Sequence, residues 1–224
     1  RCLLGQFEQI NADPGIRVVK LTANTQGQPR PVFCAGYHIG SFNQQDNDPQ
    51  LFERVANTLA ALRPITLCAL NGSVYGGATD LMLACDLSVG LTGIEFRMPA
   101  TALGLHYYPG GLQRYVARLG LSGAKRAFLT ARPFTAEMLW HMGCFEALVA
   151  PEDFDATVNR LISEIADLAP LAVQATKQSL NEIAAGQASL DAMRAREAAT
   201  SASQDFAEGR LAFQEKRKAR FAGR

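Results

Sequence analysis

Short apolar runs alternate with stretches of helical spacing over the first part of the chain. The run at 16–22 (IRVVKLT) is typical of a buried strand, and a second strand is predicted to end in the glycine turn at 32–36 (VFCAG). Apolar residues then recur at helical spacing from Leu51 to Leu62, where Arg63–Pro64 ends the helix. Strands are predicted again at 67–70 (LCAL) and 87–91. This alternation predicts an α/β fold with a largely parallel sheet.

Helical patterns dominate the chain after Gly111. Helices are predicted at 112–119 and 122–130, Thr135 is expected to cap another, and 145–149 is predicted to be an edge strand. From residue 154 onward the pattern is almost entirely helical, with the last helix expected at 190–218. We therefore predict a core at residues 1–150 and a C-terminal helical region at 151–224.

The stretch at 71–86 (NGSVYGGATDLMLACD) carries the clearest chemical signal. Gly76 and Gly77 have no side chains, so a ligand can approach the main chain closely there. A helix is predicted to begin at Ala78, and N–H groups at a helix start lack intrahelical partners and carry partial positive charge. Asp80 is expected about one turn into this helix. The arrangement suits a ligand that is anionic or gains negative charge, although a glycine pair alone is also typical of a tight turn.

Composition narrows the possible functions. With 224 residues, 48% of them hydrophobic, the chain can bury a substantial core. A formal charge of +1, with 22 basic and 21 acidic residues, gives no sign of a nucleic-acid surface. No apolar run reaches the ~20 residues of a membrane span, and the N-terminal residues do not resemble a signal peptide. The five cysteines lack metal-ligand spacing, so we expect free thiols, no metal and a cytoplasmic location.

Three blocks of sequence resemble the crotonase (enoyl-CoA hydratase/isomerase) superfamily. They are FCAGYHIGSF (33–42), NGSVYGGATDLMLACDLSV (71–89) and EGRLAFQEKRKARFAGR (208–224), in family order and spacing. The resemblance implies a crotonase-like fold, in which a ββα unit repeats as a spiral, followed by a helical trimerisation region. The family's opening strand is not seen ahead of Arg1, so we expect part of the family's N-terminal region to be missing from this sequence.

The resemblance also implies an oxyanion hole. In the family two main-chain N–H groups hold the thioester carbonyl oxygen as it gains enolate charge, and they fall here on Tyr37 and Gly77. Preorganised donors of this kind contribute ~3–4 kcal/mol each to transition-state stabilisation. His38 stands where the family usually has an aspartate, and we expect it to order the loop. The residues expected to line the substrate site around these donors are Ala35, Gly36, His38, Ile39 and Gly76.

Two glutamates activate water in the hydratases of this family, and their positions are changed here. The first falls on Asp80 and the second on Ala100, which has no acid. Addition of water needs both an acid and a base within reach. The pattern GSVxGGA (72–78) and a tyrosine after the PA…LG segment instead resemble the methylmalonyl-CoA decarboxylase branch. That resemblance assigns to Tyr107, with Tyr108 as the competing choice, the orientation of a malonyl carboxylate.

Alternatives to this assignment remain at the sequence level. The chain is predicted to be a lyase that decarboxylates a short malonyl-type CoA, but a hydratase or isomerase using Asp80 is an open alternative. A catalytically silent acyl-CoA-binding protein is another, because the second acid is missing. The tyrosine pair is also consistent with a plug over the core, and Asp80 with a charge favoured by the helix dipole.

The C-terminal block resembles the arm that crosses onto a neighbouring subunit in crotonase trimers. Phe213 and Lys216 match positions near the CoA adenine and phosphates, although a basic helix end is also typical of solvated surface. The resemblance implies a homotrimer or a dimer of trimers. It implies no separate cofactor, because coenzyme A is part of the substrate.

Overall fold

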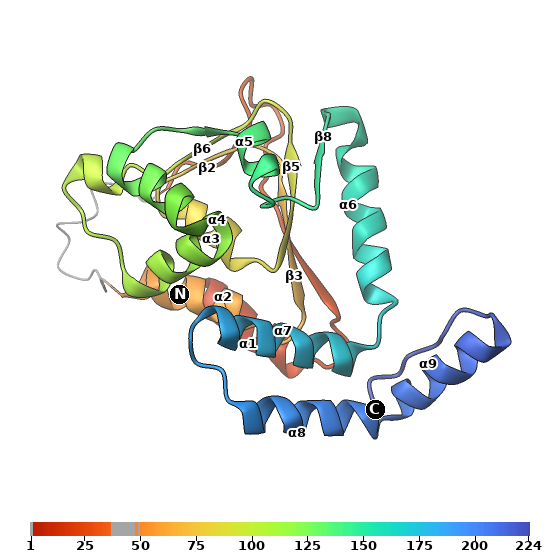
Figure 1. The fold of residues 1–224 in the computed structure, drawn as a ribbon. Helices are drawn as coiled ribbons and strands as arrows, with labels where there is room; N and C mark the ends of the chain where they lie inside the picture. The colour runs from red at the N-terminus through yellow and green to blue at the C-terminus, as the bar shows by residue number, and fades with distance from the viewer. Residues whose placement is uncertain (1, 37–47, 49) are drawn as a thin grey trace.

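The computed structural model, which describes residues 2–36, 48 and 50–224, is built on two four-stranded sheets (Figure 1). The first sheet is entirely parallel, in the order β1 (Val18–Leu21), β3 (Ile65–Leu70), β5 (Leu87–Leu91), β8 (Ala147–Val149). The second has the order β2 (Val32–Cys34), β4 (Ser73–Tyr75), β6 (Glu95–Arg97), β7 (Phe134–Thr135), and its last strand is antiparallel. The predicted α/β class with mainly parallel strands is confirmed.

The chain repeats one motif three times. Each time it passes through a strand of the first sheet, then a strand of the second sheet, and then a helix. We call these the ββα units. Their helices are α2 (Leu51–Ala60), α3 (Ala78–Ala84) and α4 (Pro109–Thr130). This is the spiral repeat that the resemblance implied, and α2, α3 and α4 pack beside one another.

Strand β3 is apolar at every position except Thr66, and its packing explains why. Successive side chains of a strand point to opposite faces. Cys68 and Leu70 belong to the large core cluster formed with α2, α3 and α4, whereas Leu67 and Ala69 belong to a smaller cluster formed with α6. Both faces of the strand are therefore covered. Its one polar side chain, Thr66, is buried and donates to the Asp86 carboxylate at 2.8 Å.

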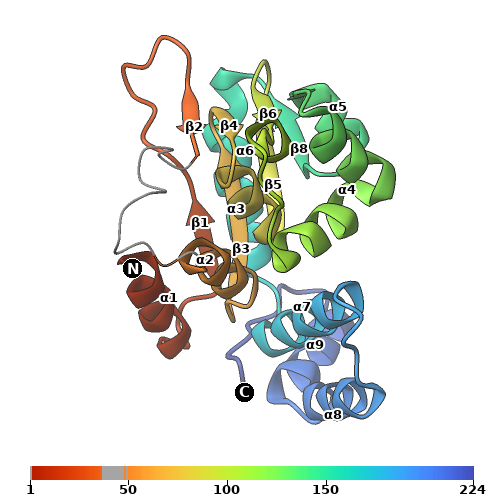
Figure 2. The ribbon, with the colours of Figure 1, turned by 90° about the vertical axis from the view of Figure 1, so that its left-hand side faces the viewer.

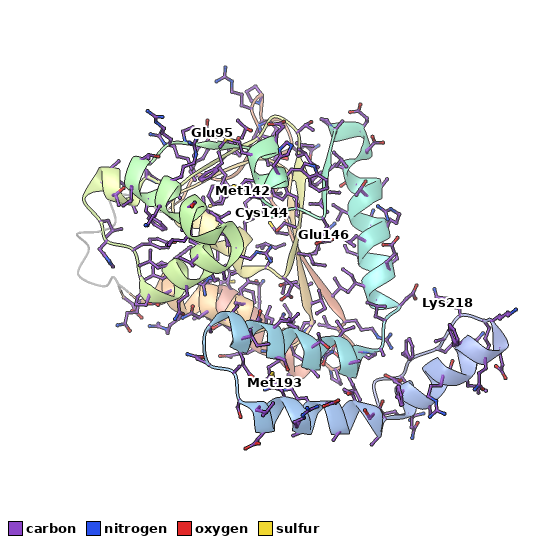
Figure 3. The ribbon with its side chains drawn as sticks, in the orientation of Figure 1. Glu95, Met142, Cys144, Glu146, Met193 and Lys218 are labelled. Carbon is purple, nitrogen blue, oxygen red and sulfur yellow. The ribbon has the colours of Figure 1, made fainter. Side chains whose placement is uncertain are left out.

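Helices α6 (Pro151–Ala166), α7 (Pro170–Ala184), α8 (Leu190–Ser201) and α9 (Gln204–Glu215) complete the chain. Phe154 and Val158 of α6 pack on the first sheet, so this helix covers the sheet although it follows the division predicted at residue 150. Figures 1 and 2 show that α8 and α9 lie away from both sheets. The C-terminal tail returns past α9, where Lys218, labelled in Figure 3, forms an ion pair of 2.5 Å with Asp167.

Several local expectations differ from the structure. Helix α1 (Cys2–Ala12) and strand β4 were not predicted, and the helix expected at 190–218 is broken. The break occurs because the Ser203 hydroxyl accepts a hydrogen bond from the Phe206 N–H and so starts a new helix. Thr135 caps α5 (Ala136–His141) as predicted. All five cysteines are free thiols, and no helix in the described ranges is long and apolar enough to cross a membrane.

Candidate active site

Two glycines bring the carboxyl ends of β2 and β4 together. The strands are parallel, with Cys34 opposite Val74, so the residues that follow them meet at one edge of the sheet. Gly36 has φ +92°, and a Cβ there would lie 2.8 Å from the Tyr75 carbonyl oxygen. Gly76 has φ +57°, in the left-handed region that glycine adopts most readily. Glycine is therefore required at Gly36 by both conformation and space.

Gly77 begins α3 as its N-cap, with helical φ and ψ of −56° and −28°. Its N–H makes no hydrogen bond to any residue in the described part of the chain. A Cβ on Gly77 would lie 3.0 Å from the Phe52 ring of α2. The missing side chain thus leaves room for Phe52 beside the Gly77 N–H. This N–H lies at the start of α3, where main-chain donors carry partial positive charge.

The other side of the same peptide group is firmly held. The Gly76 carbonyl accepts hydrogen bonds from the Thr79 N–H at 3.0 Å and the Thr79 hydroxyl at 2.6 Å. The Thr79 hydroxyl also shares a very short hydrogen bond with the hydroxyl of Tyr115 on α4. Thr79 and Tyr115 are both inaccessible to solvent. The plane of the Gly76–Gly77 peptide is therefore fixed from within the core.

Asp80 forms a buried ion pair with Arg114 of α4. The Asp80 side chain is 0% exposed, and its two oxygens accept from Arg114 Nε at 2.9 Å and Nη2 at 2.6 Å. Arg114 Nη1 donates to the Asn57 side-chain oxygen on α2 at 2.7 Å. Burial alone would lower the pKa of Arg114, but its hydrogen bond to the Asp80 carboxylate and the attraction of that charge raise it above its usual value. Arg114 therefore stays a cation, held by two hydrogen bonds to one carboxylate.

The two neighbouring tyrosines have different surroundings. The Tyr108 hydroxyl donates to Asp80 Oδ2 at 2.5 Å, and the Tyr107 hydroxyl donates to Tyr108 at 2.9 Å. Tyr107 is 6% exposed and its ring packs on Tyr115 and Phe128, so it belongs to the core. Burial and the Asp80 charge raise the pKa of both phenols well above the usual value, which keeps them protonated. Of the two, Tyr108 is the one that contacts Asp80.

The position that matches the second glutamate contains no polar side chain. Ala100 begins the short helix η2 (Ala100–Leu103), is 4% exposed, and belongs to the apolar cluster that contains Tyr107. Its methyl group can neither donate nor accept a proton. The pair of acids needed to add water across a double bond is therefore absent from these two positions.

Other predicted site residues are distributed as follows. Ala35 and Gly36 follow β2 at the edge just described, whereas Tyr37, His38 and Ile39 lie outside the described residues. Phe213 is 85% exposed near the end of α9, and Lys216 is the residue that ends this helix, with φ +53°. The roles assigned to all of these residues remain predictions.

Arg114, Phe52 and Asn57 were not singled out from the sequence. A buried carboxylate needs a cationic partner, so the expectation that Asp80 lies in a pocket implies that a basic residue lies beside it. The pattern does not say which of the 22 basic residues supplies it. Phe52 and Asn57 carry no such signal, because their placement depends on how α2 packs against α3 and α4.

Comparison with known proteins agrees with this geometry. The family model for enoyl-CoA hydratase/isomerase matches residues 3–224. The 2,3-dehydroadipyl-CoA hydratase of Escherichia coli is 32% identical over 99% of this chain and 87% of its own length. The methylmalonyl-CoA decarboxylase of the same organism is 26% identical over 94% of this chain and 82% of its own length. A crystal structure of an enoyl-CoA hydratase from Bacillus anthracis superposes with a TM-score of 0.85 at 25% identity, covering 99% of this chain and 87% of that one. The chain therefore belongs to the enoyl-CoA hydratase/isomerase family, within the crotonase superfamily of acyl-CoA enzymes.

Proposed function

We propose that this protein stabilises the enolate of an acyl-CoA thioester and forms that enolate by decarboxylating a short malonyl-type thioester such as methylmalonyl-CoA. One observation carries the choice of reaction. The acid of the site, Asp80, is already neutralised by Arg114, and Ala100 stands where a second acid would be. Decarboxylation needs no second acid, because the electrons that form the enolate come from the bond that breaks.

The chemical step uses the Gly77 N–H as one donor, and the proposed Tyr37 N–H as the other. The bond between the thioester α-carbon and its carboxylate breaks, CO2 leaves, and the electron pair becomes the enolate. The negative charge gathers on the thioester oxygen, where the two N–H groups stabilise it. The α-carbon then takes a proton, which comes from water, and the saturated acyl-CoA is released.

The electrostatics of the buried cluster do not oppose an anionic substrate. An unpaired Asp80 would repel a substrate carboxylate, but the bidentate contact with Arg114 cancels its charge. The Tyr108 hydroxyl beside Asp80 is a neutral group that keeps its proton. Phe52 contacts Gly77 and lies near the Tyr108 ring, with a centroid distance of 6.2 Å. We therefore assign the orienting role to Tyr108, whose one proton would turn from Asp80 to the substrate carboxylate, with Tyr107 supporting it from the core.

A second candidate is hydration or isomerisation of an enoyl-CoA with Asp80 as the acid–base group. It is favoured by the relative at 32% identity, which is a 2,3-dehydroadipyl-CoA hydratase, and by the lower identity, 26%, of the decarboxylase. Here Asp80 would have to exchange protons while bound to Arg114. This candidate shares the oxyanion hole with the first but predicts different products.

Mass spectrometry on two substrates separates the candidates. The purified protein is expected to convert methylmalonyl-CoA into a thioester lighter by one CO2, and to leave crotonyl-CoA unhydrated. Hydration of crotonyl-CoA without loss of CO2 from methylmalonyl-CoA would contradict the decarboxylase proposal. In that case Asp80→Asn should abolish the hydration. Binding of both thioesters with no turnover would instead indicate a silent acyl-CoA-binding protein.

Two conservative substitutions distinguish the tyrosines. Tyr108→Phe is expected to lower kcat for decarboxylation by about 10- to 100-fold, because it removes the hydroxyl whose one proton, donated here to Asp80, would turn to the substrate carboxylate. Tyr107→Phe is expected to lower it less than about threefold, because the lost hydroxyl reaches only Tyr108 and the ring still packs in the core. Steady-state kinetics on the two variants measures the difference. Equal losses, or the larger loss in Tyr107→Phe, would contradict the assignment.

We also propose that the C-terminal helices contact a second copy of the chain, as a trimer or dimer of trimers requires. Large apolar side chains exposed on α7, α8 and α9 support the proposal, because contact with a second copy would remove their apolar surface from water. They are Leu180, Ile183, Leu190, Phe206, Leu211 and Phe213. In such an assembly Phe213 and Lys216 would be available to the coenzyme A of a neighbouring subunit.

A further inference from the structure

A buried chain of hydroxyl groups ends on the peptide that carries the proposed oxyanion donor. It runs from the Tyr115 hydroxyl to the Thr79 hydroxyl, and from Thr79 Oγ1 to the Gly76 carbonyl oxygen at 2.6 Å. The carbonyl of Gly76 and the N–H of Gly77 belong to the same peptide group. Hydrogen bonds on one side of this group therefore act on the donor at its other side.

The direction of each hydrogen bond in the chain follows from chemistry. The Gly76 carbonyl can only accept, so the single proton of the Thr79 hydroxyl points toward it. Thr79 must then accept from Tyr115. Burial raises the pKa of Tyr115 well above its usual value, so its phenol keeps the proton that it donates. All donors in the chain point toward the Gly76–Gly77 peptide.

We propose that Thr79 and Tyr115 are positioning residues of the oxyanion hole, which polarise and orient the Gly77 N–H through the Gly76 carbonyl. The inference rests on the part of the proposed function that places an enolate at Gly77, and not on the choice of reaction. Chains of hydrogen bonds strengthen one another in a buried, low-dielectric environment. An N–H whose carbonyl already accepts two hydrogen bonds is a better donor to a developing oxyanion.

The local structure does not need these hydroxyls to form α3. The Thr79 N–H already bonds to the Gly76 carbonyl at 3.0 Å, and the Asp80 N–H bonds to the Gly77 carbonyl at 3.0 Å, so the first turn is closed by main-chain groups. The Tyr115 ring packs on Phe96 and Phe128 whether or not it carries a hydroxyl. Valine and phenylalanine would fill the two positions with little change of shape. Neither helix formation nor packing therefore requires the hydroxyls of Thr79 and Tyr115, and we assign their effect to the Gly76–Gly77 peptide.

Acetoacetyl-CoA is a suitable probe, because its enolate absorbs in the near ultraviolet and forms by loss of one acidic α-proton to water, with no carbon–carbon bond broken. At fixed pH and with the protein saturated by acetoacetyl-CoA, the fraction of bound ligand present as enolate is measured. The proteins compared are the wild type, Thr79→Val, Tyr115→Phe and the double variant. We expect the enolisation constant of the bound ligand to fall about two- to eightfold for each lost hydroxyl. Thr79→Ser, which keeps the hydroxyl, is expected to restore the wild-type value. The double variant leaves no buried hydroxyl without its partner, so it remains informative if Thr79→Val alone folds poorly.

A matched control is Thr130→Val, since the Thr130 hydroxyl also bonds to a main-chain carbonyl at 2.6 Å but lies at the far end of α4. It should leave the enolate fraction unchanged. An unchanged enolate fraction in Tyr115→Phe and the double variant would overturn the inference, as would a wild type that binds the probe without forming enolate. A wild type that enolises the probe but does not decarboxylate methylmalonyl-CoA would overturn only the proposed reaction.

Discussion

Replacing Arg114 with methionine is expected to lower the free energy of unfolding by about 3–5 kcal/mol, because the Asp80 carboxylate would stay buried without its counter-charge. Asp80 is 0% exposed and receives two of its hydrogen bonds from Arg114, whose own side chain is only 15% exposed. A typical domain has about 5–15 kcal/mol of stability in total, so this loss is large. Urea unfolding, with a comparison of midpoints and slopes, measures it.

Two further variants test the cause of this loss. Arg118→Met removes an arginine one turn later on α4 that donates to the Asp86 carbonyl at 2.9 Å, and it should cost about 1–2 kcal/mol. Combining Arg114→Met with Asp80→Asn should recover part of the stability, because a neutral amide needs no cation. Additive losses in the double variant would show that the ion pair is not the source of the effect.

Gly36→Ala is expected to lower turnover by at least about 100-fold, the loss typical of removing one oxyanion donor. Gly36 has φ +92°, and the new Cβ would lie 2.8 Å from the Tyr75 carbonyl oxygen, so the end of β2 must move away from Gly76. The proposed Tyr37 N–H belongs to the peptide that follows Gly36. Because both candidate reactions use the same oxyanion hole, the expected loss holds for either.

The matched control for Gly36→Ala is Gly27→Ala. Gly27 has φ +77°, but no atom lies within 4 Å of the place that a Cβ would take, so its variant reproduces the backbone strain without the collision. Its variant should lose about 1 kcal/mol of stability and keep its turnover. Steady-state rates at saturating substrate compare the two. If Gly36→Ala retained more than a third of the wild-type rate, the close approach of β2 and β4 would not matter for catalysis.

Much of the fold was predictable because its long elements carry their own patterns. The strand predicted at 87–91 matches β5 (Leu87–Leu91), and the helix predicted at 51–62 agrees closely with α2. Strand β4 was missed because only one of its three side chains, Val74, is buried. It is held by pairing with β2 and β6, a tertiary effect that leaves no period in the local sequence.

The site was predictable where chemistry is local and not where it depends on packing. Gly76, Gly77 and Asp80 lie within five residues of one another, so their neighbourhood follows from one helix start. The partner of Asp80 is 34 residues away in the sequence, and its identity depends on how α4 crosses α3. Tyr107 and Tyr108 differ by one position, yet one faces the core and the other contacts Asp80. Sequence alone cannot choose between neighbours that point in different directions.

The guanidinium of Arg114 is where the three ββα units meet, since Arg114 lies on α4, Asp80 on α3 and Asn57 on α2. A defect in any unit that shifts its helix would disturb the same cluster. This cluster therefore forms only when all three units are folded, and in denaturant it should be lost together with global unfolding. Helices α8 and α9 lie away from both sheets (Figure 2), so they can fray earlier without disturbing the cluster, and such fraying should weaken coenzyme A binding through Phe213 and Lys216.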